Sequence, residues 1–226
     1  MQLDSIVNNA IANRGSVNTA MALVVDRSGS MYPYVQKVVE SVKNFISDQD
    51  KIRGKASLTI AQFNHEYNVI LKNQDIHKVD KNLFERMYHI YGGTSLYDAA
   101  LRAISDMEDQ LKSMAETETP KRVVIALVTD GQDVSSENTA EKVKAVIQEK
   151  QRLGWDFLLL GSDQTTLEIG ERLGIGQQKS ALFLADNVAK SVKVISDQIE
   201  KARRNKVVEI TDKERTTLLL PGKVDL

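Results

Sequence analysis

The chain has 226 residues, 42% apolar and 27% charged, which is enough to bury the core of one α/β domain. Its 30 basic and 31 acidic side chains give a formal net charge of −1, so no strong field indicates nucleic acid or an anionic membrane as a partner. The absence of cysteine excludes disulfides, thiolate metal sites and a cysteine nucleophile, and it fits a reducing compartment.

The N-terminal residues predict a short amphipathic helix. Apolar side chains recur at helical spacing over residues 3–13, and a glycine follows at position 15. This segment lacks the basic start and continuous apolar core of a secretory signal, and no segment approaches the ~20 apolar residues of a membrane helix. We therefore expect a cytoplasmic protein.

The first half of the chain then predicts a strand, a helix and a hairpin. The run TAMALVVD, residues 19–26, is a buried strand, and residues 31–49 carry apolar side chains along one helical face. Two strands, 56–64 and 67–73, are separated by too few residues for a crossover helix. They should therefore pair as an antiparallel hairpin.

The second half predicts helices alternating with strands after a loop at 78–91. The elements are, in order, a glycine-led helix within 91–114, a strand at 122–130, a helix at 137–153, a strand at 155–161, a helix at 165–173, a strand at 180–186 and a helix at 187–204. Strands that alternate with helices form right-handed crossovers, which predicts a mostly parallel sheet covered on both faces.

The predicted organisation is an N-terminal helical extension, 1–17, one domain, 18–204, and a C-terminal tail, 205–226. The tail holds one possible strand, 207–210, followed by the apolar sequence LLLPG. Two hypotheses stay open for it: it docks back on its own domain, or it adds to the sheet edge of another subunit.

The sequence DRSGS places Asp26, Ser28 and Ser30 at the end of the first strand. These residue types favour helix caps and turns, so one interpretation is a strand-to-helix turn that satisfies its own backbone N–H groups. The other is that the three side chains converge on a phosphate or a metal ion.

Two further polar residues follow predicted structural boundaries in the same way. Asp130 closes the strand RVVIALVTD, and Thr94 follows two glycines just before a helix. Ligands of open α/β sheets bind at the carboxyl ends of the strands, where the strand order reverses. If the strands that end at Asp26 and Asp130 are neighbours, the two carboxylates and three hydroxyls can meet. Such hard oxygen ligands suit Mg²⁺ or Mn²⁺ and not zinc or copper.

These residues, in this order on an alternating β/α pattern, resemble a von Willebrand factor A domain. The sequences DRSGS, YGGTSLYDA and VTDGQD match its metal-ion-dependent adhesion site (MIDAS), and the resemblance covers roughly 18–204. It implies a Rossmann-like, doubly wound sheet of six strands, mostly parallel with one antiparallel edge strand, and helices on both faces. The predicted 57–73 hairpin agrees with that edge strand.

The resemblance also implies a role for each residue. Ser28 and Ser30 would coordinate the ion directly, and Thr94 directly or through water. Asp26 and Asp130 would hold it mainly through waters. Mg²⁺ is the expected ion, with Mn²⁺ or Ca²⁺ as alternatives. The implied function is non-enzymatic binding of a protein partner whose Asp or Glu carboxylate completes the coordination, as in intracellular bacterial or phage adaptor and assembly factors.

Two alternatives remain. One is a Mg²⁺-dependent phosphohydrolase of the haloacid dehalogenase kind, but Ser28 stands where that chemistry needs a second acid. The other is a structural subunit whose metal site only stabilises the fold. Near the site, Asp98 is expected to cap a helix and Asp133 to lie in a turn. The three histidines are expected to be ordinary surface residues: His65, His77 and His89.

Overall fold

The computed structural model describes residues 16–131, 133–162, 165–182 and 188–219, so the helix predicted at 3–13 lies outside the described residues. The described chain forms one sheet in the order β3-β2-β1-β4-β5-β6. Its strands are β1 (Thr19–Asp26), β2 (Ala56–Phe63), β3 (Tyr67–Asp75), β4 (Arg122–Val128), β5 (Trp155–Gly161) and β6 (Ser180–Leu182). β3 is antiparallel to β2 and the other neighbouring pairs are parallel, which confirms the predicted mixed sheet and its antiparallel edge.

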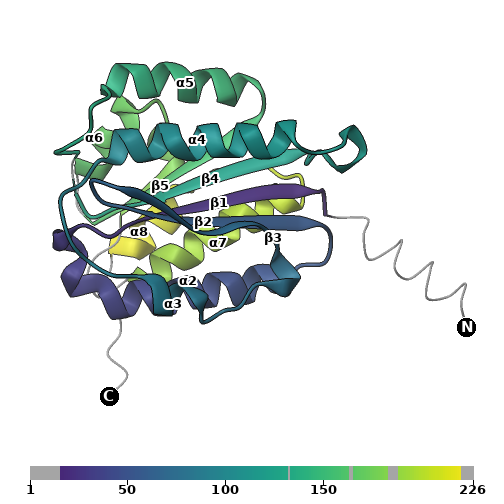
Figure 1. Cartoon of the computed structure of the whole chain (residues 1–226), viewed down its shortest axis with the longest axis horizontal. Helices are drawn as coiled ribbons and strands as arrows, with labels where there is room; N and C mark the ends of the chain where they lie inside the picture. The colour runs from purple at the N-terminus through teal and green to yellow at the C-terminus, as the bar shows by residue number, and fades with distance from the viewer. Residues whose placement is uncertain (1–15, 132, 163–164, 183–187, 220–226) are drawn as a thin grey trace, which may run out of the picture.

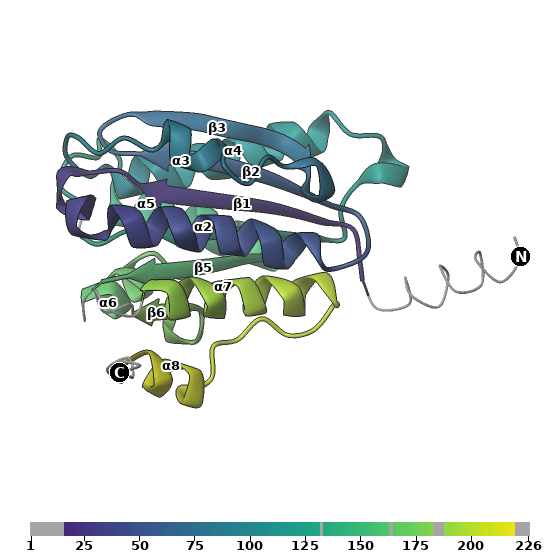
Figure 2. The same cartoon turned by 90° about the horizontal axis from the view of Figure 1, so that it is seen from below.

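Helices cover both faces of this sheet (Figure 1). The first face carries α2 (Val35–Asp50), α3 (Leu83–Met87) and α7 (Val188–Arg203), and the second carries α4 (Leu96–Lys112), α5 (Ala140–Arg152) and α6 (Thr165–Arg172). Short 3₁₀ turns are η1 (Gly29–Tyr34), η2 (Ile76–Lys78), η3 (Glu116–Glu118) and η4 (Gln177–Lys179). α8 (Asp212–Leu219) lies beyond α7 (Figure 2).

The central strand β1 is buried on both sides, because its side chains alternate between two cores. Met21, Leu23 and Val25 face the core beneath α2 and α7, and small residues of β1 face α4. α4 presents its own small side chains there, at Ala99 and Ala103, which lets helix and sheet pack closely. An apolar strand with no polar alternation is typical of this position.

Several predicted boundaries differ from the structure. The strand β4 ends at Val128, two residues before the predicted end, and the hydroxyl of the next residue, Thr129, donates to Asp26 Oδ2. The predicted loop at 78–91 contains α3. Helix α5 begins at 140, because Thr139 accepts a hydrogen bond from the backbone N–H of Lys142 at 3.4 Å and so caps the helix.

The strand predicted at 207–210 is wrong. These residues are extended and bury Val208 and Ile210, but they join no ladder: the Ile210 N–H donates to the Gln178 carbonyl at 2.7 Å. The helix α8 that follows was not expected, and it packs against β6 and α7 with Leu218 buried. The described part of the tail therefore docks on its own chain, and the domain boundaries at 17 and 204 stay predictions.

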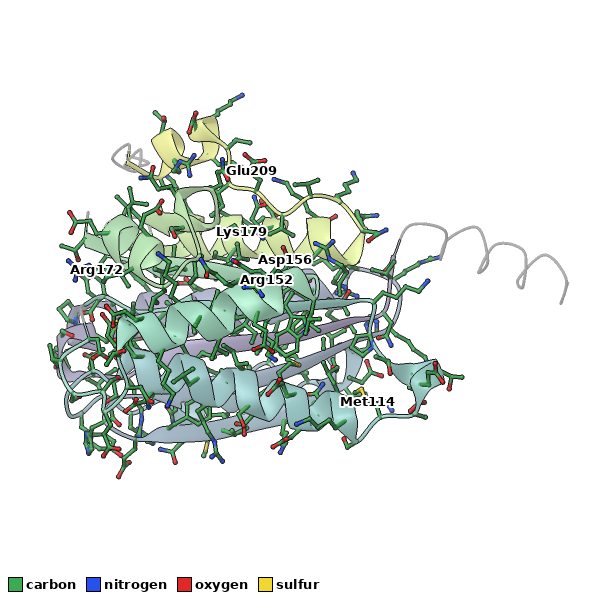
Figure 3. All side chains as sticks on the ribbon, turned by 90° about the horizontal axis from the view of Figure 1, so that it is seen from above. Met114, Arg152, Asp156, Arg172, Lys179 and Glu209 are labelled. Carbon is green, nitrogen blue, oxygen red and sulfur yellow. The ribbon has the colours of Figure 1, made fainter. Side chains whose placement is uncertain are left out.

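The amino ends of β4 and β5 carry a polar cluster of their own. Asp156 accepts hydrogen bonds from Arg122 and from Lys179, the latter at 2.8 Å, beside an open pocket of about 330 Å³ that Glu209 also lines (Figure 3). These ion pairs join β4, β5 and η4. In the described part of the chain, no helix is long and apolar enough to cross a membrane.

Candidate metal centre

The candidate site lies where the strand order reverses. β1 pairs in parallel with both β2 and β4, so the loops that follow β1 and β4 leave the same edge of the sheet side by side. The register places Val25 opposite Val128, one residue before Asp26 and two before Asp130. The condition under which the predicted ligands can meet, that these two strands are neighbours, is therefore fulfilled.

Asp26 is the most deeply placed residue of the group. Its side chain is fully buried, and both carboxylate oxygens accept hydrogen bonds: Oδ1 from the Ser28 N–H at 2.7 Å and Oδ2 from the Thr129 hydroxyl at 2.6 Å. Its carbonyl accepts from the Tyr88 hydroxyl at 2.5 Å. The bond to Ser28 is the turn predicted by the capping interpretation of DRSGS.

A chain of side-chain contacts continues from this turn to β4. Ser28 Oγ and Ser30 Oγ lie 3.0 Å apart, and Ser30 Oγ donates to Asp130 Oδ1 at 2.8 Å. Ser28 is buried, whereas Ser30 is exposed and Asp130 is half-buried. The Asp130 carbonyl is fixed by the Ser162 hydroxyl at 2.6 Å, so the loop after β5 also supports the site. The group thus runs from the buried carboxylate of Asp26 to the surface.

Thr94 is brought to this group by its backbone neighbours. The Gly29 N–H donates to the Gly92 carbonyl at 3.0 Å, which joins the two glycine-containing loops. The Thr94 carbonyl accepts from Val134 N–H at 2.9 Å and from Ser135 N–H at 3.1 Å, in the loop that follows Asp130. Thr94 is buried between these loops, so the structure brings all five predicted residues to one edge of the sheet.

Asp98 and Asp133 hold the Thr94 and Asp130 loops together. Asp133, from the loop after β4, accepts from the Tyr97 N–H at 3.1 Å and so caps the start of α4. Asp98, in α4, accepts from the backbone N–H groups of Glu137 at 2.9 Å and Asn138 at 3.0 Å. Asp133 lies in a loop, close to the predicted turn, but the prediction that Asp98 caps its own helix is wrong: Asp133 caps α4, and Asp98 instead holds the loop before α5.

Gly92 has a backbone that other residues rarely adopt. Its φ is +78°, and a Cβ atom there would lie 2.3 Å from Nδ1 of His65. A glycine at this position therefore allows both the positive φ and the close approach of the His65 side chain. All three histidines are exposed, as predicted, and His77 also pairs with Asp50.

The available donors fit a hard divalent cation. The group offers carboxylate and hydroxyl oxygens and neither imidazole nor thiolate, which suits Mg²⁺, Mn²⁺ or Ca²⁺. Among the described residues, no group of three or more His, Cys, Asp or Glu side chains could hold a metal by itself. A cation at this edge therefore needs the serine and threonine hydroxyls as ligands.

The electrostatics of Asp26 also favour a cation. Burial raises its pKa from 3.8 to about 6, although the hydrogen bonds from Thr129 and Ser28 lower it, and the charge of Asp130 adds to the rise. Near neutral pH the site therefore holds an ionised carboxylate removed from water. A bound cation would offset that cost.

Sequence reasoning missed a second group that borders the site. Arg27 lies inside DRSGS yet is only 4% exposed. Its guanidinium stacks 4.3 Å from the centre of the Tyr91 ring, and its Nη2 atom lies 3.1 Å from Glu66 Oε2. The Tyr91 hydroxyl donates to the same Glu66 oxygen at 2.6 Å. No sequence signal joins residues so far apart in the chain.

Comparisons with known proteins agree with this architecture. The family model described as von Willebrand factor type A domain matches residues 21–198. The vWF domain of the type V pili tip protein Mfa5 from Porphyromonas gingivalis aligns with a TM-score of 0.62 at 13% identity, covering 87% of this chain and 99% of that one. No curated protein matches the chain in sequence.

Two further structures of the same fold are described with metals. The manganese-loaded Plasmodium vivax TRAP protein aligns with a TM-score of 0.59 at 16% identity, over 79% of this chain and 73% of that one. Proximal thread matrix protein 1 from the mussel byssus, with a zinc-occupied MIDAS motif, aligns with a TM-score of 0.57 at 16% identity. That alignment covers 84% of this chain and 46% of the mussel protein. Because the sequence identities are only 13–16%, these structural similarities establish the fold and nothing more.

Proposed function

The chain belongs to the von Willebrand factor type A domain family, and we propose that it is a divalent-metal-dependent protein-binding module. Domains of this family generally act in adhesion and interaction and not as enzymes. The ion is held at the ends of β1 and β4 by the oxygen atoms of five residues: Asp26, Ser28, Ser30, Thr94 and Asp130.

The observation that carries this proposal is the continuous chain of polar contacts across the ends of two strands. Asp26, Ser28, Ser30 and Asp130 are linked by contacts of 2.7 to 3.0 Å, although the two aspartates are far apart in sequence. Hydroxyl and carboxylate oxygens this close together can exchange their mutual hydrogen bonds for coordination of a common ion. Mg²⁺ is the proposed ion, because it favours oxygen ligands and retains waters that buried carboxylates can orient.

The proposed partner supplies an Asp or Glu carboxylate to the ion. Neutral hydroxyl ligands leave a divalent ion electron-poor, so it attracts a further anionic oxygen. The surrounding surface suits a protein: the exposed fractions of Tyr32, Tyr91 and Val134 are 77%, 43% and 72%. Each lies within four residues of a proposed ligand, and exposed apolar side chains around a polar centre are typical of protein-binding surfaces.

The cellular setting is proposed from the family resemblance. We expect a cytoplasmic adaptor or assembly factor of a bacterium or phage, with no nucleic acid or membrane as partner. The phosphohydrolase alternative is not favoured, because the family match points elsewhere and the Asp26 carboxylate is fully buried and hydrogen-bonded on both oxygens. A nucleophile needs an accessible oxygen.

The first test measures the metal alone. Mn²⁺, whose unpaired electrons allow detection by electron paramagnetic resonance, is titrated into wild type, Thr94→Ala and Asp130→Asn. One Mn²⁺ per chain that Mg²⁺ displaces and that both substitutions weaken would support the site. If neither substitution changed Mn²⁺ binding, the proposed ligands would be wrong.

The second test concerns the partner. Wild type and Thr94→Ala serve as baits for a native lysate in Mg²⁺ and again in EDTA. We expect a protein retained only by wild type in Mg²⁺. A partner indifferent to both changes would place the binding surface elsewhere and leave the metal a structural role.

A further inference from the structure

Arg27, Tyr91 and Glu66, here called the clasp, join three of the loops around the candidate metal centre. Arg27 comes from the loop after β1, Glu66 from the β2–β3 hairpin and Tyr91 from the loop that carries Thr94. We propose that Arg27 is a positioning residue: through the clasp it holds Thr94 where the ion needs it. This inference rests on the proposed metal-binding function.

The backbone contacts show why the clasp acts on Thr94. The Tyr91 N–H donates to the Arg27 carbonyl at 3.0 Å, so the loop that leads to Thr94 is anchored on both the backbone and the side chain of Arg27. From the other side, Asn64 Nδ2 donates to the Tyr91 carbonyl at 2.7 Å, and the Asn64 carbonyl accepts from Ser95 N–H at 2.8 Å. Thr94 thus lies between two anchored residues, Tyr91 and Ser95.

The side-chain contacts of the clasp close a triangle. The guanidinium of Arg27 stacks on the Tyr91 ring and pairs with Glu66, and Tyr91 donates its hydroxyl to Glu66. The hydrogen bond from Tyr91, with smaller contributions from His65 and Arg27, lowers the pKa of Glu66, so the carboxylate stays ionised at neutral pH. A planar guanidinium can stack on a ring and donate at its edge at the same time, which lysine cannot do.

The charge of Arg27 is unfavourable beside a cation site, so the buried position of this residue needs an explanation. Arg27 separates Asp26 from Ser28 in sequence, and a positive charge there would repel a divalent ion. Glu66 compensates the positive charge of Arg27, and the guanidinium stacks on the Tyr91 ring. A compensated charge and a fixed side chain suit a residue that positions its neighbours. They do not suit a residue that attracts the ion.

Positioning and charge therefore predict opposite effects for Arg27→Met. Removing the cation while Glu66 remains would strengthen Mn²⁺ binding if only charge mattered. If the clasp holds Thr94, the same substitution weakens Mn²⁺ binding, by about fivefold, a size typical of couplings between contacting groups. Tyr91→Phe, which removes only the hydroxyl contact with Glu66, should weaken binding less. Tyr32→Phe is its control, because it removes a hydroxyl from the same face outside the clasp.

A double-mutant cycle with Thr94→Ala decides the question, with Mn²⁺ affinity measured for the full chain by electron paramagnetic resonance and folding checked by the melting temperature in EDTA. If Arg27 acts through Thr94, Arg27→Met has no further effect once Thr94 is alanine. Additive losses, or tighter binding by Arg27→Met, would overturn the inference. If Arg27→Met does not fold, the cycle of Tyr91→Phe with Thr94→Ala applies the same criterion. Failure of wild type to bind Mn²⁺ would instead overturn the proposed function, and the inference with it.

Discussion

Replacing Asp26 by asparagine should make the metal-free protein more stable above pH 6. Asp26 is fully buried, and mainly for that reason its pKa rises from 3.8 to about 6. The folded protein therefore holds this proton more tightly than the unfolded chain does. An amide at position 26 carries no charge, keeps an acceptor for the Ser28 N–H and can donate to the Thr129 hydroxyl, which is free to rotate.

The sign and size of the effect follow from the two pKa values. As the pH rises from about 4 to 6, the unfolded chain loses the Asp26 proton first, so the free energy of unfolding falls; above pH 6 the loss is constant. The interval from 3.8 to about 6 corresponds to about 3 kcal/mol at 1.36 kcal/mol per pH unit. For a chain of this size, that is about 6–12 °C in melting temperature.

Urea unfolding of wild type and Asp26→Asn in EDTA, from pH 4 to pH 8, measures this difference. The two proteins should be about equally stable at pH 4, and the variant more stable above pH 6. Asp80→Asn is the control, because the hydrogen bond from Arg86 lowers the pKa of that surface carboxylate and its removal gives no such gain. If Asp26→Asn were no more stable than wild type at pH 7, burial would not be costing the metal-free site any stability.

Three further variants test other parts of the structure. Gly92→Ala should destabilise the protein by about 1–3 kcal/mol in urea unfolding, because its φ is +78° and the new Cβ would meet His65. Tyr32→Ser combined with Val134→Ser should weaken the captured partner about tenfold and leave Mn²⁺ affinity unchanged, because these exposed side chains are not ligands. Ile210→Ala should cost about 2–5 kcal/mol in urea unfolding, because this tail residue is fully buried; a smaller loss would indicate a detached tail.

The sheet was predictable because its strands are marked by uninterrupted apolar runs. β1, β4 and β5 are buried along almost their whole length, and such strands carry no polar alternation that could be confused with a surface helix. The last helix was missed because α8, DKERTTLL, is polar and has almost no apolar periodicity. Residues 207–210 read as a strand because three of the four are β-branched and apolar, but the burial of Val208 and Ile210 does not require a partner strand.

The candidate site was predictable to the extent that its residues occur in short local motifs. DRSGS and VTDGQD each place polar side chains directly after an apolar strand, and parallel strands bring such ends together. The contacts that position these motifs were not predictable. Arg27 reads as a solvated charge, and its partners, Glu66 and Tyr91, occur in a hairpin turn and a loop that the sequence does not relate to it.

The same geometry links metal binding to stability. Asp26 is ionised at neutral pH in a buried position, while the nearest arginine in sequence has its charge compensated by Glu66. A divalent ion at the proposed site would supply the missing positive charge, so binding should return much of the stability that burial of Asp26 costs. Ligand present at 100 times its dissociation constant stabilises a protein by about 2.7 kcal/mol. At that concentration the gain is similar in size to the cost of the buried carboxylate, so the ion is expected to offset most of that cost at pH 7.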